Sequence, residues 1–264
     1  MKKLIITMAL MAMAGIASAQ NVRYIYIPGD GEHRLGLVLG PSFGQKEMSM
    51  SDTRNSSSST ATINSSLGFD IGIRWGYETE WGRTIEWGNH TALMYSMVPF
   101  SGEYTVNGGA NHKISYLGQA AHLYESPNMV ISLSDQLKLT LGIGLDIRFA
   151  IPGKTKVDGQ TLERVKSSDN GDLLVSILNI SAGFDGNVGC KYFITDEMYV
   201  GGRLQYNFYS YSFMDMENDF DGGEAKPESY AGMMAVDMAN KQSAAIYVPK
   251  PMPVQLMFEV GYRW

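Results

Sequence analysis

Apolar and polar residues alternate with a period of two along several segments of the chain. Between Leu67 and Tyr77 every odd position is apolar, whereas the even positions hold Gly, Asp and Arg. The segment 136–150 repeats the pattern, with Leu, Ile or Phe at each odd position. Successive side chains of a strand point to opposite faces, so this alternation predicts β-strands that are apolar on one face and polar on the other.

Eight segments follow the alternation, and each is long enough to cross a membrane as a tilted strand, which needs about 9 to 11 residues. One of them changes its parity between Gly118 and Ala121, where we expect a β-bulge. The predicted strands are 34–44, 66–77, 87–97, 112–125, 136–150, 178–192, 198–209 and 254–264.

The connections between these segments alternate in length. The long ones are 45–65, 100–111, 151–177 and 212–252, and the short ones are 78–85, 126–135 and 193–197. Long loops at one rim and short turns at the other are typical of membrane barrels, in which the short turns and both termini are periplasmic. The sequence therefore predicts an all-β fold, a closed antiparallel up-and-down transmembrane barrel of about eight strands. Ten strands are the alternative, if 21–28 or part of 212–252 pairs in the barrel.

The N-terminal residues have the features of a secretory signal peptide. Met1, Lys2 and Lys3 precede an apolar run that ends in Ala17-Ser18-Ala19, so we expect residues 1–19 to be removed. We assign 20–33 to an N-terminal extension and 34–264 to the barrel. The single cysteine, Cys190, excludes an intramolecular disulfide.

Aromatic residues fall near both ends of the predicted strands, as expected of side chains that favour the interface between membrane and water. The predicted girdles are Trp75, Tyr77, Trp87 and Tyr192 at the short-turn rim, and Tyr95 and Phe149 near the long-loop rim. In the alternative, a water-soluble sandwich or lipocalin-like barrel, these rings would fill the core.

With its signal peptide, its eight alternating strands and its C-terminal segment 257–264, the chain resembles small bacterial outer-membrane β-barrel proteins of the OmpA/OmpX type, within the porin superfamily. The resemblance implies that the last strand is read by the barrel-assembly machinery, with Val260, Tyr262 and Trp264 as the signal. The usual final residue of this signal is Phe, so Trp264 departs from it. The resemblance also implies the outer membrane of a Gram-negative bacterium, with lipid and lipopolysaccharide as neighbours.

The inward positions of the strands carry both signs of charge in comparable number. An eight-stranded barrel leaves room only for side chains or one small ligand, so we expect these charges to pair and plug the interior. Strand positions predict that Arg203 and Glu259 pair. The candidate residues of this polar network are Asp70, Arg74, Lys138, Asp146, Arg148, Asp185, Lys191, Arg203, Glu259 and Arg263.

Neither catalysis nor a cofactor is expected from the sequence. His112 is the one histidine near the long-loop side, and no G-x-S-x-G motif occurs, so an enzyme at the rim is the remote alternative. We assign no metal site. The acidic loop offers a weak calcium-like spacing, for which a solvated loop is the simpler interpretation; its residues are Glu217, Asp219, Asp221 and Glu228.

The net charge of −6 and the pI near 5.2 argue against nucleic acid as a partner. The loops at 49–66 and 212–252 have the composition of mobile surface segments, which fits contact with an external ligand or a host surface. The sequence therefore predicts a structural or surface-interaction role. A narrow porin for small solutes is the alternative.

Overall fold

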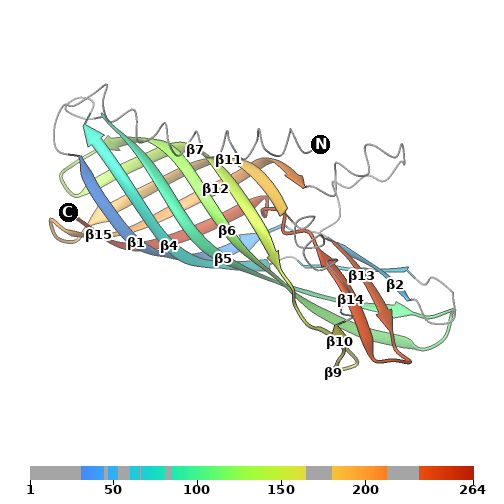
Figure 1. The fold of residues 1–264 in the computed structure, drawn as a ribbon. Helices are drawn as coiled ribbons and strands as arrows, with labels where there is room; N and C mark the ends of the chain where they lie inside the picture. Colours follow the sequence, from blue (N-terminus) through green and yellow to red (C-terminus); the bar gives the residue numbers. More distant parts are fainter. Residues whose placement is uncertain are drawn as a thin grey trace, which may run out of the picture.

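The computed structural model describes residues 31–44, 47–52, 60–65, 67–80, 85–164, 180–212 and 232–264. Within them, eight antiparallel strands form a closed ring, in which each strand pairs with the next and the last returns to the first (Figure 1). All eight predicted strands are confirmed. In ring order they are β1 (Glu32–Phe43), β4 (Leu67–Glu80), β5 (Ile85–Thr105), β6 (Asn111–Ser132), β7 (Leu137–Ile151), β11 (Ile180–Phe193), β12 (Met198–Ser212) and β15 (Val254–Arg263).

The seam between β1 and β15 closes the barrel at the end that carries the short turns. The amide of His33 donates to the carbonyl of Trp264, and the amide of Trp264 donates back to His33, each at 3.0 Å. The turns 133–136 and 194–197 connect strands at this same end. The first and last described strands therefore begin and end together at the short-turn rim.

The two faces of the ring are the reverse of those of a water-soluble barrel. Outward side chains are apolar and exposed, among them Leu37 at 63% and Ile143 at 65%, whereas the inward Arg148 is 0% exposed. Such an arrangement is stable only when hydrocarbon covers the outside. This observation excludes the soluble sandwich and the soluble barrel.

The predicted bulge in β6 is wrong. The register of β6 with β5 is continuous from Asn111 to Ile131, and Gly118 and Ala120 simply face inward. A side chain at Gly118 would meet the ring of Tyr247, so the inward position must be small. The register shift lies instead between Phe184 and Asp185, where β11 pairs with β12.

The strands β5 and β6 are longer than the sequence predicts, and they extend beyond the barrel as a hairpin. They remain paired up to Thr105 and Asn111, so the loop expected at 100–111 shortens to a turn at 106–110. β8 (Thr155–Val157) pairs with the extended part of β6, and β9 (Gln160–Thr161) pairs with β8.

A second, five-stranded sheet packs on this hairpin. Together with the hairpin extension and β8–β9 it forms a compact region that we call the head (Figure 1). The strands of the second sheet, in order, are β10 (Glu163–Arg164), β14 (Gln242–Tyr247), β13 (Gly232–Asp237), β2 (Met48–Asp52) and β3 (Thr60–Ile63). Part of 212–252 therefore does form strands, but in the head and not in the barrel.

The head has its own hydrophobic core. In β2, Met48 and Met50 alternate with serines and are fully buried beside Met234 of β13, which pairs with β2 in parallel. Phe100 and Tyr116 of the hairpin contribute from the other side, and their rings and that of Tyr247 lie close together. The described parts of 49–66 and 212–252 are thus packed strands, which corrects their interpretation as mobile loops.

None of the described residues forms a helix long and apolar enough to span a membrane.

Candidate functional site: the barrel interior and its mouth

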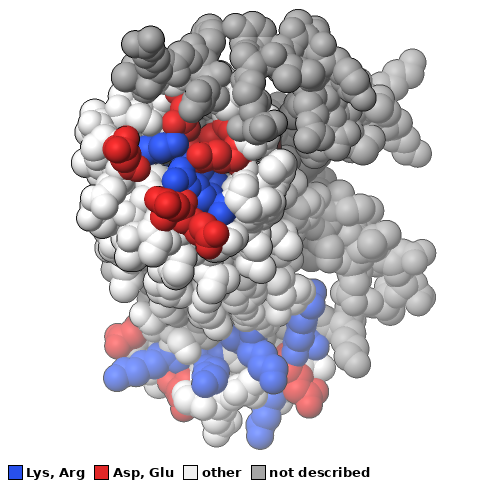
Figure 2. Space-filling model, turned by 90° about the vertical axis from the view of Figure 1, so that its left-hand side faces the viewer, with Lys and Arg blue, Asp and Glu red and all other residues white. Residues whose placement is uncertain are grey.

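The inside of the barrel is filled by charged and polar side chains from all eight strands. The predicted network residues lie there as expected from strand parity, and all but one are buried; Arg263 is half-buried at the rim. A view into the short-turn end shows both signs of charge within the ring (Figure 2). The network divides into three groups along the barrel.

At the short-turn end, Glu78 of β4 faces three basic groups. Its carboxylate lies 2.6 Å from Nη2 of Arg34, 2.5 Å from Nζ of Lys191 and 3.0 Å from Nε2 of His90. Arg203 donates to Nδ1 of His90 at 2.6 Å. These partners define the neutral tautomer of His90 that donates to Glu78 and accepts from Arg203.

The short-turn rim is closed by further ion pairs around one aromatic ring. Lys138 pairs with Glu86 at 2.6 Å, and Arg263 pairs with Glu32 at 3.0 Å. The guanidinium of Arg263 lies 4.4 Å from the ring centre of Phe193, a cation–π distance. The positive charges at this rim therefore have both carboxylate and aromatic partners.

In the middle of the barrel, Glu259 pairs with Arg74 at 2.6 Å and accepts from the hydroxyl of Tyr199, also at 2.6 Å. The predicted pairing of Glu259 with Arg203 is therefore wrong. Arg203 stands opposite Met257 in the register, two residues away from Glu259. The strand between Arg74 and Glu259 carries Gly36, where a Cβ atom would lie 2.8 Å from the Glu259 carboxylate, so the glycine leaves the space through which the two side chains meet.

A double-mutant cycle tests this pair. Replacing Glu259 alone by alanine should lower the free energy of unfolding by about 3 kcal/mol, because it leaves Arg74 buried without its carboxylate. The R74A/E259A variant should be more stable than E259A, since it removes both charges. Urea-induced unfolding in detergent micelles, followed by tryptophan fluorescence, measures E259A, R74A and the double variant; a double variant as unstable as the sum of the two single ones would contradict the pairing.

The third group lies toward the head. Asp146 pairs with Arg148 at 2.8 Å and with Nδ1 of His122, also at 2.8 Å. Nε2 of His122 faces Asp70 at 3.5 Å, and Ser96 donates to Asp70 and accepts from Arg148. Two acids and one arginine thus surround one histidine.

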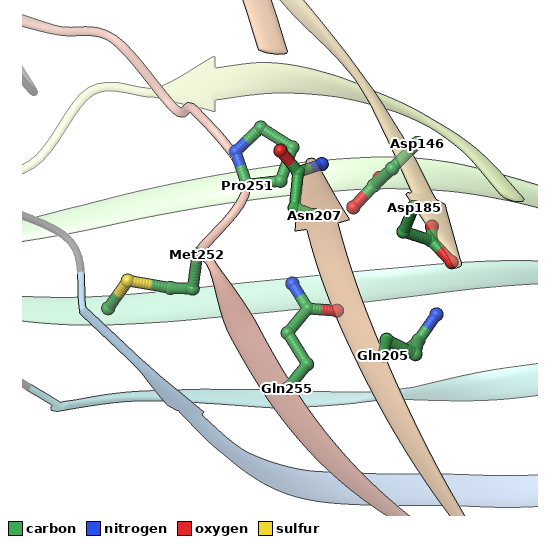
Figure 3. Close-up of a pocket in the computed structure, with 7 residues that line it drawn as sticks. All are labelled: Asp146, Asp185, Gln205, Asn207, Pro251, Met252 and Gln255. Atoms are coloured by element: carbon green, nitrogen blue, oxygen red, sulfur yellow. The ribbon is translucent and has the colours of Figure 1, made fainter. Parts of the chain in front are cut away.

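Above this group, the segment 248–253 crosses the mouth of the barrel, and we call it the strap. Ser181 of β11 donates to the carbonyl of Pro249 at 2.8 Å, whereas Met252 lies against Gly68 of β4. These two strands stand on opposite sides of the ring. Beneath the strap is a small polar pocket (Figure 3), lined by Asp146, Asp185, Gln205, Asn207, Pro251, Met252 and Gln255.

The predicted surface residues all face outward. Trp75, Trp87, Tyr192 and Phe149 are exposed, whereas Tyr77 and Tyr95 are half-buried, the latter because its hydroxyl donates to Gln119. The three residues of the predicted assembly signal also face outward and are exposed: Val260, Tyr262 and Trp264. The weak metal candidates Glu217, Asp219, Asp221 and Glu228 lie outside the described residues, as does the predicted signal peptide.

His112, the candidate for a catalytic base, lies in the head. Its Nδ1 is 2.7 Å from Asp158, which also accepts from the amide of Lys113, and its ring lies against that of Tyr104. The hydrogen bond from His112, followed by the one from the Lys113 amide, lowers the pKa of Asp158. Through these contacts His112 stabilises the packing of β6 against the turn that follows β8.

Several members of the network were not predicted from the sequence, although strand parity marks them. Arg34 is the first residue of the predicted strand 34–44, Glu78 lies one position beyond the predicted strand 66–77, and His90 and His122 are even-numbered inward residues. Tyr199 faces inward although aromatic residues were expected outside. Following the alternation to the end of each strand would have found the first four.

A closed ring of antiparallel strands, with an apolar outer belt and an ion-paired interior, defines a small outer-membrane β-barrel protein. The ring of eight paired strands and its exposed apolar outer side chains are the features that define this class.

No protein-family model matches the sequence, and no curated protein matches it significantly. Among solved structures, the chain is similar to Ail, the attachment invasion locus protein of Yersinia pestis, with 10% identity, 89% of this chain and 100% of that chain covered, and a TM-score of 0.36. It is also similar to the outer membrane protein OprG from Pseudomonas aeruginosa, with 11% identity, coverage of 89% and 96%, and a TM-score of 0.39. A third similar structure is the translocator domain of the autotransporter NalP from Neisseria meningitidis, with 8% identity, 98% of this chain and 96% of that chain covered, and a TM-score of 0.35.

Proposed function

We propose that the protein is a non-conducting barrel of a Gram-negative outer membrane that holds the head at the cell surface for structural or surface interaction. In this proposal the short-turn rim, where His33 pairs with Trp264, is periplasmic, and the head is external. The partners that it implies are outer-membrane lipid, lipopolysaccharide, the barrel-assembly machinery and an external ligand.

The observation that carries the proposal is the double obstruction of the barrel. Charged side chains in the interior are joined across the lumen, as Arg74 and Glu259 are at 2.6 Å. The strap then crosses the mouth and is held to β11 by Ser181. A permeating solute would have to displace both the strap and paired charges that lack access to bulk water, and separating such charges is costly.

Conductance across a planar lipid bilayer tests the proposal. The purified protein should give no steady channels. A variant with Arg74 and Glu259 both replaced by serine, which removes the central pair, should pass more current than the native chain. Steady channels from the native protein would overturn the proposal in favour of a narrow porin.

We further propose that the barrel is not an enzyme. Among the described residues, the side chain of His112 contacts Asp158 and Tyr104, and neither is a nucleophile of the kind that a catalytic histidine activates. The native protein should therefore leave phospholipid and peptide substrates intact. Turnover that is abolished in His112→Ala would contradict this expectation.

A further inference from the structure

The head projects sideways beyond the outline of the barrel and so overhangs the membrane surface. In Figure 1 the extended β5–β6 hairpin continues the tilt of its strands and carries β10 and β14 below the barrel. Figure 2 views the molecule from the left-hand side of Figure 1, along the barrel from its short-turn end. The part of the head visible below the ring therefore faces back toward the bilayer.

Figure 2 shows a group of Lys and Arg side chains on this membrane-facing side of the head, with fewer Asp and Glu side chains among them. The exposed basic residues that the structure describes in the head are Lys113, Lys154, Lys156, Arg164 and Lys241. Exposed acids are fewer there, and one of them, Asp158, is bound to His112. Among the exposed residues that the structure describes in the head, basic side chains therefore outnumber the acids Glu103, Asp158 and Glu163, whereas the whole chain has a net charge of −6.

Backbone pairing brings these basic residues together from distant parts of the sequence. Lys156 of β8 stands opposite Ser115, on the same outward face of β6 as Lys113. The amide of Glu163 donates to the carbonyl of Lys241 at 2.9 Å, which brings the β13–β14 turn next to Arg164. The amide of Leu162 donates to Thr155 at 3.0 Å and joins the two groups.

The face is continuous with the lipid-facing belt. On β6 the outward positions run from Lys113 through Ser115 to Leu117, which is an exposed apolar residue. Cations placed directly beyond an apolar belt lie at the depth of lipid headgroups, where each Lys or Arg near an anionic surface changes partitioning about fivefold.

We propose that this basic face, formed by β6, β8, β10 and the β13–β14 turn, binds the phosphate groups of anionic lipids in the outer leaflet. Binding fixes the overhanging head against the membrane surface. The inference takes the external placement of the head from the proposed function. Its test needs only a barrel that spans a bilayer, so lipid binding can fail while the non-conducting function stands, and the reverse.

Hydrogen exchange in lipid nanodiscs tests the proposal on the full chain. The amides of 155–164 should exchange about fivefold more slowly in phosphatidylcholine discs containing phosphatidylglycerol than in pure phosphatidylcholine. High salt should remove the difference, because it screens exposed charges. Equal exchange rates in the two lipids at low salt would overturn the proposal.

Charge variants of the head provide the matched control. The variant K113Q/K156Q/R164Q/K241Q should lose the effect of phosphatidylglycerol, whereas E103Q/E163Q, which removes exposed acids of the same region, should increase it. Unchanged protection of the β13–β14 amides shows that the head remains folded in both variants. If the first variant still showed slower exchange with phosphatidylglycerol, the proposal would be contradicted. The same holds if inorganic phosphate added to phosphatidylcholine discs slowed the exchange of the native chain as much as phosphatidylglycerol does.

Discussion

Replacing Glu78 by alanine should lower the free energy of unfolding by about 3 to 5 kcal/mol, one of the two largest effects that we expect in this chain. Glu78 is the carboxylate that Arg34, Lys191 and His90 share at the short-turn end. Without it, the Arg34 guanidinium, the Lys191 amine and the histidine lie together in an interior without bulk water, where like charges repel strongly. Urea-induced unfolding in phospholipid vesicles, followed by tryptophan fluorescence, measures the loss.

Two variants show whether the charge is responsible. Glu78→Gln keeps the shape and one acceptor but removes the charge, so its stability should lie between those of the native chain and Glu78→Ala. Thr79→Ala changes the next residue of β4, which faces outward, and should shift stability by less than about 0.5 kcal/mol. If Thr79→Ala were as destabilising as Glu78→Ala, the effect would come from the strand and not from the ion pairs.

Replacing Gly40 by alanine should prevent the barrel from closing. Gly40 lies in β1 at the closing seam, and a Cβ atom there would run into the backbone carbonyl of Leu256 in β15. A backbone atom in a paired strand cannot move aside as a flexible side chain can, so the pairing of β1 with β15 has to separate locally. The fraction of protein that migrates as the compact, heat-sensitive form in gel electrophoresis should fall severalfold.

The control for this substitution is another strand glycine. Gly186 in β11 would place its Cβ atom in open space, so Gly186→Ala should fold as well as the native chain. A normal yield of folded Gly40→Ala would show that the seam can widen at this position, contrary to the expectation.

The barrel could be predicted from the sequence because its information is local. Each strand has to be apolar on one side for hydrocarbon and polar on the other, and this requirement alone places Asp70, Arg148 and Lys191 inside. The same rule fails to predict partners. Whether Glu259 pairs with Arg74 or Arg203 depends on the stagger between strands and on the space above Gly36. Neither property can be read from the sequence of a single strand.

The head could not be predicted for a different reason. β2 pairs in parallel with β13, which lies far away in the sequence, and a strand of five residues gives only a weak alternation. The parity of Met48 and Met50 is visible in the sequence, but their partner Met234 is not. The extension of β5 and β6 was not predicted, because the alternation was interpreted as an apolar face toward lipid. In the extension the apolar residues Phe100 and Tyr104 face a protein core instead.

The core of the head also limits how the exterior of this protein can change. Met48, Val157 and Met234 come from three different connections between barrel strands and Tyr104 from the extended β5–β6 hairpin, yet they belong to one buried cluster. A sequence insertion or an epitope graft within the described part of any one of these segments is therefore expected to disturb residues contributed by the other three. In the described head, variation that preserves this cluster is confined to outward-facing side chains, so substitution is compatible with the fold where exchange of a whole segment is not.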